Sequence, residues 1–254
     1  MSESLDFNTK LLLICGKSGA GKSYSFKNIP DQKNWWFLNT EAGKALPYRN
    51  QFDRYVITDP DLVTLALEQG TGNPDCHGII VDSLTFLMDM YESTKILAPG
   101  VDTRKAWSFY QQYFKTVLQQ KVPLFNKPVI FTAHLKEVYN ESTMEWESTV
   151  PIKGALAGNG VEAYFNQIVY AKKMPVKKLE KFEKDNKLLH ITDRERKLGF
   201  KHVFQTMITA DAINEKIRGP EDMFTEAETY IDNDVNQLLQ RIDEYYGSPV
   251  ANVA

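Results

Sequence analysis

Residues 11–23 carry the sequence LLLICGKSGAGKS, an apolar run followed by a glycine-rich stretch. The glycine-rich part fits the pattern G-x-x-x-x-G-K-[ST], in which glycines let backbone N–H groups converge on a phosphate. The apolar run predicts a buried strand, and residues 24–29 predict a helix that Pro30 ends. This order of elements predicts a Walker A phosphate-binding loop, with the positive end of the helix directed at the anion.

The motif assigns a role to each position of the loop. Its lysine reaches the β- and γ-phosphates and its hydroxyl binds Mg²⁺. We therefore expect ATP and Mg²⁺ as cofactors, Lys22 as a catalytic residue and Ser23 as a metal ligand. The predicted nucleotide-binding set is Gly16, Lys17, Ser18, Gly19, Ala20, Gly21, Lys22, Ser23 and Tyr24.

The composition is that of a globular protein. Of the 254 residues, 43% are hydrophobic and 25% are charged, which argues against a disordered chain. No apolar run is long enough to cross a bilayer, and the first four residues lack the pattern of a signal peptide. We expect a cytoplasmic protein without membrane contact. Cys15 and Cys76 lack metal-ligand spacing and are expected to be reduced residues near the core.

Three polar residues follow apolar runs farther along the chain. Asp82 ends the run GIIVD and is predicted to orient Mg²⁺ together with Ser23. Ser83 follows it, so the group that activates water has to come from elsewhere. Glu41, after the aromatic strand at 35–39, is the predicted catalytic base if that strand lies beside the phosphate-loop strand. His134 ends the strand at 128–134 and is a candidate γ-phosphate sensor. Simpler alternatives are a capping or solvated Glu41 and a structural His134.

The remaining pattern predicts a small antiparallel β extension and a C-terminal helix. Strand candidates lie near 176–182, 187–192 and 202–209. Apolar residues at helical spacing within 221–246 predict an amphipathic helix packed on the core. Residues 135–160 form a long polar stretch that is expected to be a functional or mobile loop. We thus expect a short polar N-terminus (1–9), a core (10–172) and a C-terminal extension (173–254).

The order of these motifs resembles the RecA-like ATPase core. The resemblance rests on the phosphate loop, then Phe37-Leu38-Asn39-Thr40-Glu41-Ala42, then Asp82-Ser83, then Thr132-Ala133-His134, and covers roughly residues 10–172. It is similar above all to the short, core-only ATPases of bacteriophages that take part in single-strand annealing and recombination. The resemblance implies an α/β fold, a RecA-like P-loop NTPase core with a mainly parallel central sheet flanked by helices.

The resemblance further implies ATP-dependent binding of single-stranded DNA and a homo-oligomer with the nucleotide site near an interface. The two DNA-binding loops would correspond to 98–104 and 135–160. We expect two departures from RecA: His134 stands where RecA carries glutamine, and a large N-terminal oligomerisation domain is not expected. The choice between ring and filament, and between annealing, strand exchange and a mediator role, stays open. If the protein is phage-encoded, its location is the host cytoplasm.

Charged residues give limited independent support for DNA binding. The loop at 135–160 combines cations and aromatic residues, which suits single strands, with four glutamates, which do not. Between residues 172 and 201, eleven Lys/Arg face five Asp/Glu, which indicates an anionic partner or a solvated face. Cations that could reach a neighbouring subunit's nucleotide are Arg194, Arg196, Lys197 and Arg218.

The leading hypothesis is a Mg-ATP-dependent ATPase of DNA recombination or annealing, with DNA-stimulated turnover. A nucleotide-gated binding or assembly protein with negligible turnover is the alternative. A P-loop kinase of a small acceptor is a third, although residues 98–105 supply only Arg104 and Lys105 as lid cations.

Overall fold

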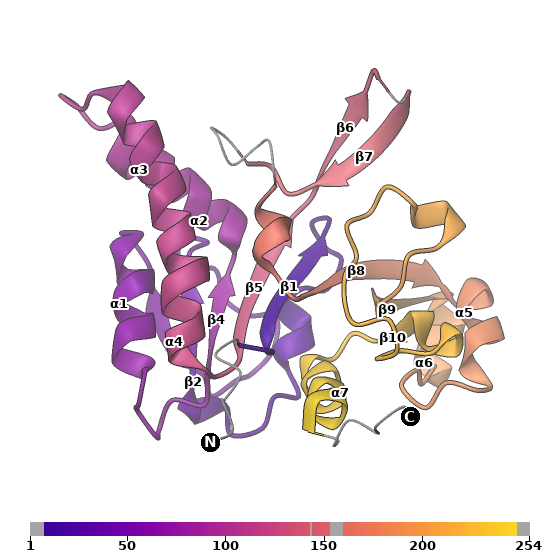
Figure 1. Cartoon of the computed structure of the whole chain (residues 1–254). Coiled ribbons are helices and arrows are strands. Elements are labelled where there is room, and N and C mark those ends of the chain that lie inside the picture. The colour runs from indigo at the N-terminus through magenta and orange to yellow at the C-terminus, as the bar shows by residue number, and fades with distance from the viewer. Residues whose placement is uncertain (1–7, 143, 153–159, 248–254) are drawn as a thin grey trace, which may run out of the picture.

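The computed structural model describes residues 8–142, 144–152 and 160–247 (Figure 1). One sheet contains eight strands in the order β10-β9-β8-β1-β5-β4-β2-β3. The strands are β1 (Leu11–Gly16), β2 (Trp35–Asn39), β3 (Asp53–Val56), β4 (Gly78–Asp82), β5 (Val129–His134), β8 (Gln167–Pro175), β9 (Phe200–Gln205) and β10 (Tyr230–Asp232). All pairs from β3 to β8 are parallel, whereas β9 and β10 join antiparallel. The mainly parallel sheet with an antiparallel extension is confirmed.

The phosphate-loop strand β1 lies in the middle of this sheet and is buried on both faces. Successive side chains of a strand point to opposite faces. Accordingly, Leu13 belongs to one hydrophobic cluster, while Leu12 and Ile14 belong to the other. A continuous apolar run is the pattern expected of a central parallel strand, because no face of it meets water.

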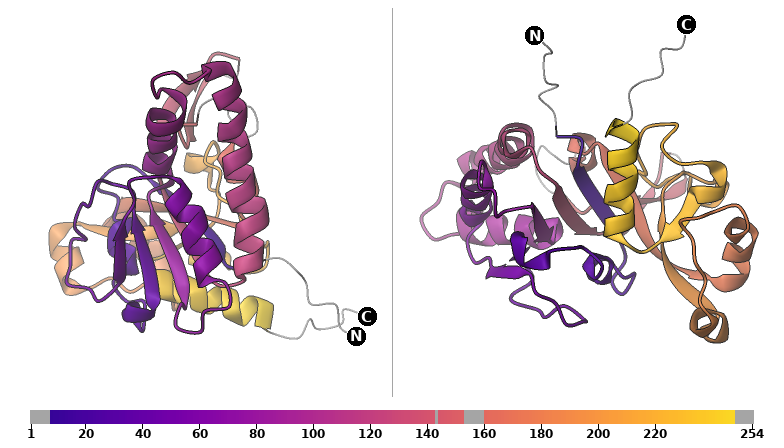
Figure 2. Two further views of the ribbon diagram at one scale, coloured as in Figure 1. Left: turned by 90° about the vertical axis from the view of Figure 1, so that its left-hand side faces the viewer. Right: turned by 90° about the horizontal axis from the view of Figure 1, so that it is seen from below.

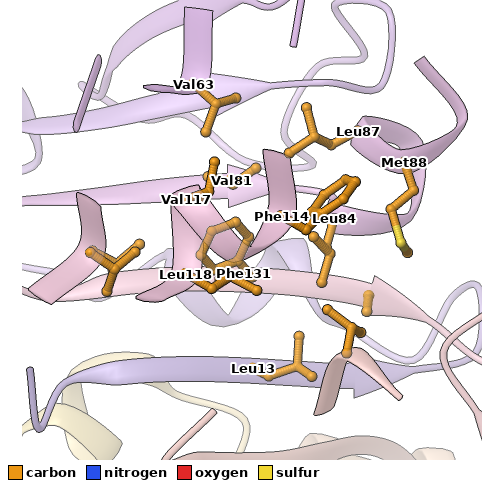
Figure 3. Packing of buried hydrophobic residues seen from close by; sticks show 14 of the residues in the cluster. Leu13, Val63, Val81, Leu84, Leu87, Met88, Phe114, Val117, Leu118 and Phe131 are labelled. Carbon is orange, nitrogen blue, oxygen red and sulfur yellow. The ribbon is translucent and has the colours of Figure 1, made fainter. Parts of the chain in front are cut away.

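Long helices cover the first face. They are α1 (Asp61–Gly70), α2 (Leu84–Tyr91), α3 (Thr103–Lys115) and α4 (Val122–Phe125), with π-helical turns at Glu92–Ile96 and Thr116–Lys121. Figure 3 shows Leu13, Val81 and Phe131 of the sheet facing residues of these helices. The side chains of Leu13, Val81 and Phe114 are fully buried, so this layer fixes the positions of β1, β4 and β5.

The C-terminal helix α7 (Val235–Gly247) covers the second face beside β1 (Figure 2). Its buried residues are Val235, Leu238, Leu239 and Ile242, at the spacing that the sequence shows. The amphipathic C-terminal helix is therefore confirmed, and it packs on the core.

The predicted helix after the phosphate loop is wrong. Residues Ser23–Phe26 form only a single 3-10 turn. Pro30 disfavours helical geometry at the residue before it, and Phe26 and Ile29 are drawn into the second-face core. Seven residues between Lys22 and Pro30 are too few for a stable helix under these constraints. An anion at this loop would depend on the loop's own N–H groups and Lys22, because the described residues that follow it form no long helix.

The C-terminal extension differs from the prediction in two places. Residues Val176–Glu183 form helix α5 instead of a strand, with Val176 and Leu179 buried one helical turn apart. The described residues 187–192 contain no strand, and they precede helix α6 (Asp193–Leu198). The sequence carried both signals: apolar residues at i and i+3 after Pro175, and the capping box of Thr192 and Glu195.

The expected loop at 135–160 contains a hairpin of β6 (Lys136–Asn140) and β7 (Glu145–Thr149), which extends away from the main sheet (Figure 1). Residues 143 and 153–159 of this stretch lie outside the described residues. Strand β8 runs across the expected domain boundary at residue 172, and β9 and β10 extend the same sheet. In the described part of the chain, no helix is both long and apolar enough to span a membrane.

Candidate nucleotide-binding site

The carboxyl ends of β1, β2, β4 and β5 meet around one cavity of about 420 Å³. Open parallel sheets bind ligands at this edge. Six of the nine predicted nucleotide-binding residues line the cavity, and Gly16, Lys17 and Ala20 line a second cavity of about 390 Å³ behind the loop. The lining residues of the first are Ser18, Gly19, Gly21, Lys22, Ser23, Tyr24, Asn39, Glu41, Lys44, Ala45, Leu46, Pro47, Asp82, His134 and His202.

Lys22 is held inside the phosphate loop. Its ammonium group donates to the carbonyl oxygens of Gly16 at 2.8 Å and Lys17 at 3.2 Å. The residue is 6% exposed, and burial lowers the pKa of its ammonium group, although the negative charges of Asp82 and Glu41 oppose this shift. These two hydrogen bonds hold the ammonium group at the loop, where it could exchange the carbonyl oxygens for phosphate oxygens.

Gly21 needs to be glycine for two reasons. Its φ of +99° lies where other residues are strained, and a Cβ would stand 2.7 Å from Nδ2 of Asn233 and 3.1 Å from Nδ1 of His202. These side chains approach closely because they form hydrogen bonds with the loop. His202 donates to the carbonyl of Ala20 at 2.9 Å, and Asn233 donates to the carbonyl of Gly21 at 2.9 Å. The C-terminal extension thus stabilises the phosphate loop, which is followed by a 3-10 turn in place of a long helix.

No sequence pattern predicts this contact. His202 lies on β9 and Asn233 follows β10, so 182 and 212 residues separate them from the loop positions that they bind. Neither belongs to a local motif, and only the folded sheet brings them to the loop.

Ser23 and Asp82, the two predicted Mg²⁺ ligands, are adjacent. The Ser23 hydroxyl donates to Oδ2 of Asp82 at 2.7 Å, and the Thr132 hydroxyl donates to Oδ1. Asp82 is 5% exposed, and burial raises the pKa of its carboxyl group, although these two hydrogen bonds and Lys22 oppose the shift. Within the described residues, no three His, Cys, Asp or Glu side chains form a complete metal site. One hydroxyl and one carboxylate nevertheless fit Mg²⁺, which takes most of its remaining ligands from phosphates and water.

Glu41 lies at the site, although its strand is not beside β1 as expected. Strand β2 is not adjacent to β1, because β4 and β5 lie between them. Instead, Oε1 of Glu41 lies 3.1 Å from Nε2 of His134, whose Nδ1 lies 3.3 Å from the Lys22 ammonium. An imidazole with its proton on Nε2 satisfies both contacts, donating to Glu41 and accepting from Lys22. His134 therefore connects the predicted base to the phosphate lysine.

The second oxygen of Glu41 is also engaged. Lys44 Nζ lies 2.9 Å from Oε2, and the Glu41 side chain is only 9% exposed. The hydrogen bond from His134 and the contacts with Lys44 lower the pKa of Glu41 to about 2, although burial acts in the opposite direction. The carboxylate is thus ionised and fully partnered in this arrangement.

The other predicted cations lie away from the cavity. Arg196 pairs with Glu183 at 2.6 Å, and Arg218 donates to a backbone carbonyl. In the basic segment, Lys172 pairs with Glu215 at 2.6 Å and Lys173 lies over the ring of Phe200. These contacts neutralise or cover part of the positive charge that the sequence indicated. Arg104 and Lys105, at the start of α3, do not line the cavity either.

A family model described as "AAA domain" matches residues 8–212, which include the whole of this site. The chain therefore belongs to the AAA-domain family, and its phosphate loop defines it as a nucleotide-binding protein of the ATPase type. No curated protein matches the sequence. Among solved structures, the crystal structure of the RadB recombinase is similar at 15% identity and a TM-score of 0.40, over 66% of this chain and 77% of that one. That similarity is too low to transfer any property of RadB.

Proposed function

We propose that this protein binds and hydrolyses Mg-ATP and that its nucleotide state controls binding of single-stranded DNA in recombination or annealing. The observation that carries the proposal is a chain of side-chain hydrogen bonds from Lys22 through His134 to Glu41. It lies beside the hydrogen-bonded pair of Ser23 and Asp82. All five side chains line one cavity, which supports roles for Lys22 as the phosphate-binding cation, for Ser23 and Asp82 as metal ligands and for Glu41 as the base.

In the proposed reaction, the oxygen of a water molecule attacks the γ-phosphorus while the bond from that phosphorus to the bridging β–γ oxygen breaks. Glu41 orients the water and accepts its proton. Lys22 leaves the loop carbonyls and stabilises charge on the phosphates, and ADP and phosphate are the products. Bound Mg²⁺ would supply further neutralisation of the triphosphate, held by Ser23 and Asp82.

The DNA half of the proposal rests on the hairpin that follows β5. Strand β6 begins two residues after His134, and Lys17 of the phosphate loop pairs with Glu137 of β6 at 2.7 Å. The hairpin exposes Tyr139 and Trp146, whose rings lie 5.4 Å apart. Exposed aromatic rings are the surface on which bases of a single strand stack. A change in the loop on nucleotide binding thus has a direct route to a candidate DNA surface.

The test is ATP hydrolysis with and without single-stranded DNA, with Lys22→Ala as the control. We expect turnover that rises with DNA, that is lost in Lys22→Ala, and DNA binding that depends on ATP and weakens with salt. If turnover stays constant throughout a DNA titration and no DNA binds at low salt, the nucleic-acid half of the proposal is wrong. Trp146→Ala, which removes a 64% exposed ring, should weaken DNA binding without changing ATP affinity.

A nucleotide-gated binding protein with negligible turnover is the second candidate. The observation that favours it is the low pKa of Glu41, about 2, since a carboxylate with both oxygens partnered is a poor base. A homo-oligomer with its nucleotide site near an interface belongs to either candidate, and light scattering with and without ATP measures it. Turnover of the parent protein compared with Glu41→Gln separates the two: ATPase activity that the substitution abolishes supports the enzyme, and an inactive parent that still binds ATP supports the second candidate.

A further inference from the structure

We propose that Lys44 binds the γ-phosphate from within the same chain and that its departure from Glu41 frees that carboxylate to act on water. This inference rests on the proposed function and assigns a role to a residue that no motif marks. Lys44 would supply from within the same chain a cation at the nucleotide. The sequence suggested Arg194, Arg196, Lys197 or Arg218 of a neighbouring subunit for that role.

The position of Lys44 is fixed by its backbone. The side chain of Asn39 accepts hydrogen bonds from the backbone of Glu41 at 2.9 Å and Gly43 at 3.3 Å, and donates to the carbonyl of Lys44 at 2.7 Å. Ala42 and Gly43 have φ values of +52° and +77°, which close the turn tightly. Asn39 itself is 8% exposed, so the turn is anchored to the end of β2.

The side chain of Lys44, in contrast, is free to move. It is 69% exposed, and among the described residues its one ion pair is the contact with Oε2 of Glu41. It lines the same cavity as Lys22, Ser23 and Asp82. An ammonium group on a four-carbon stem can change partners without any backbone movement.

Charge decides which partner Lys44 prefers. Without nucleotide, Lys44 pairs with Glu41, which also contacts His134. The terminal phosphate of a triphosphate carries more negative charge than a carboxylate and presents three acceptor oxygens. ADP lacks that group. Lys44 should therefore turn to the γ-phosphate when ATP binds and remain on Glu41 when ADP binds.

The consequence for Glu41 follows from its surroundings. While Lys44 and His134 both contact it, the carboxylate is stabilised as the anion and is weakly basic. Loss of the Lys44 contact would leave one oxygen available to water and make the carboxylate a better proton acceptor. A single movement of the Lys44 side chain would then both bring a cation to the γ-phosphate and activate Glu41 as the base.

The experiment compares ATP and ADP affinity of Lys44→Ala, Lys44→Arg and the parent by titration with fluorescent nucleotides, together with kcat and KM. We expect Lys44→Ala to weaken ATP binding about 10-fold or more and to leave ADP binding within about twofold, because only ATP offers the γ-phosphate. Its kcat should fall as well, because the cation at the transferring phosphate is lost, although Glu41 is then free of Lys44. Lys44→Arg should recover most of the ATP affinity. The matched control is Lys33→Ala, an exposed lysine that does not line the cavity.

Equal effects on ATP and ADP, or no effect on either, would overturn the role of Lys44. Unchanged kcat and KM in Lys44→Ala alongside an active parent would do the same. These outcomes differ from failure of the proposed function, in which the parent itself neither binds nor hydrolyses ATP. If the parent binds ATP without turning it over, the comparison of ATP with ADP still decides whether Lys44 contacts the γ-phosphate.

Discussion

The contact of the C-terminal extension with the phosphate loop leads to a quantitative prediction. His202→Ala and Asn233→Ala each remove one hydrogen bond to a loop carbonyl, at Ala20 and Gly21. A hydrogen bond of this kind contributes about 1 kcal/mol, and a carbonyl left without a partner costs about 1–3 kcal/mol. If half of this loss, about 0.5–1.5 kcal/mol, appears as disorder of the loop before nucleotide binds, each variant should weaken ATP and ADP binding about 2- to 12-fold alike.

The assay is a titration with fluorescent ATP and ADP, paired with urea unfolding of each variant. The matched control is Asn28→Ala, because Asn28 also bridges to the C-terminal extension, through Asp234 at 2.7 Å, but does not touch the loop carbonyls. His202→Asn keeps a donor near the position of Nδ1 and should bind nucleotide better than His202→Ala. Wild-type affinity in both alanine variants, or an equal loss in Asn28→Ala, would refute the idea that these bonds organise the loop.

Three further predictions concern stability. The pKa of Glu41 is about 2 in the folded protein and ordinarily 4.5, so its contribution to stability is present above about pH 4.5 and is lost as the pH falls toward 2. Urea unfolding at a series of pH values should therefore show a smaller loss of stability in acid for Glu41→Gln than for the parent. Phe114→Ala removes a fully buried ring from the first-face core and should lower the free energy of unfolding by about 3–5 kcal/mol in the same assay, a smaller loss indicating that the core closes over the gap. The exposed pair of Lys17 and Glu137 should show a coupling energy below about 1 kcal/mol in a double-mutant cycle, decreasing with salt, and a salt-independent value would contradict this interpretation.

Local sequence was sufficient where a residue's role depends on its immediate neighbours. The phosphate loop lies at the end of β1 as predicted, since a short apolar run before a glycine-rich turn is typical of a doubly buried strand and the glycines permit positive φ. Asp82 and Ser23 are adjacent because both stand at the carboxyl edge of one parallel sheet. The strand predicted near 176–182 is wrong, although the spacing of Val176 and Leu179 fits the helix α5 that forms there.

Strand order was beyond the reach of local sequence, and it changed the meaning of Glu41. The chain order β1, β2, β4, β5 suggested that β2 neighbours the phosphate-loop strand, but the sheet places β5 and β4 between them. Pairing of parallel strands is decided by the helices that must pack across them, which depends on the whole core. Glu41 consequently meets the phosphate lysine through His134, a contact between residues 93 positions apart.

The sequence by itself determined that this chain has a nucleotide phosphate loop and a mainly parallel α/β sheet, because each follows from short-range pattern and backbone sterics. Only the tertiary structure decided what supports and controls that loop. A 3-10 turn replaces the expected helix, and α7, His202 and Asn233 from the far end of the chain take over its support. Such contacts depend on which distant segments share a face of the sheet, and burial of the whole core selects that arrangement.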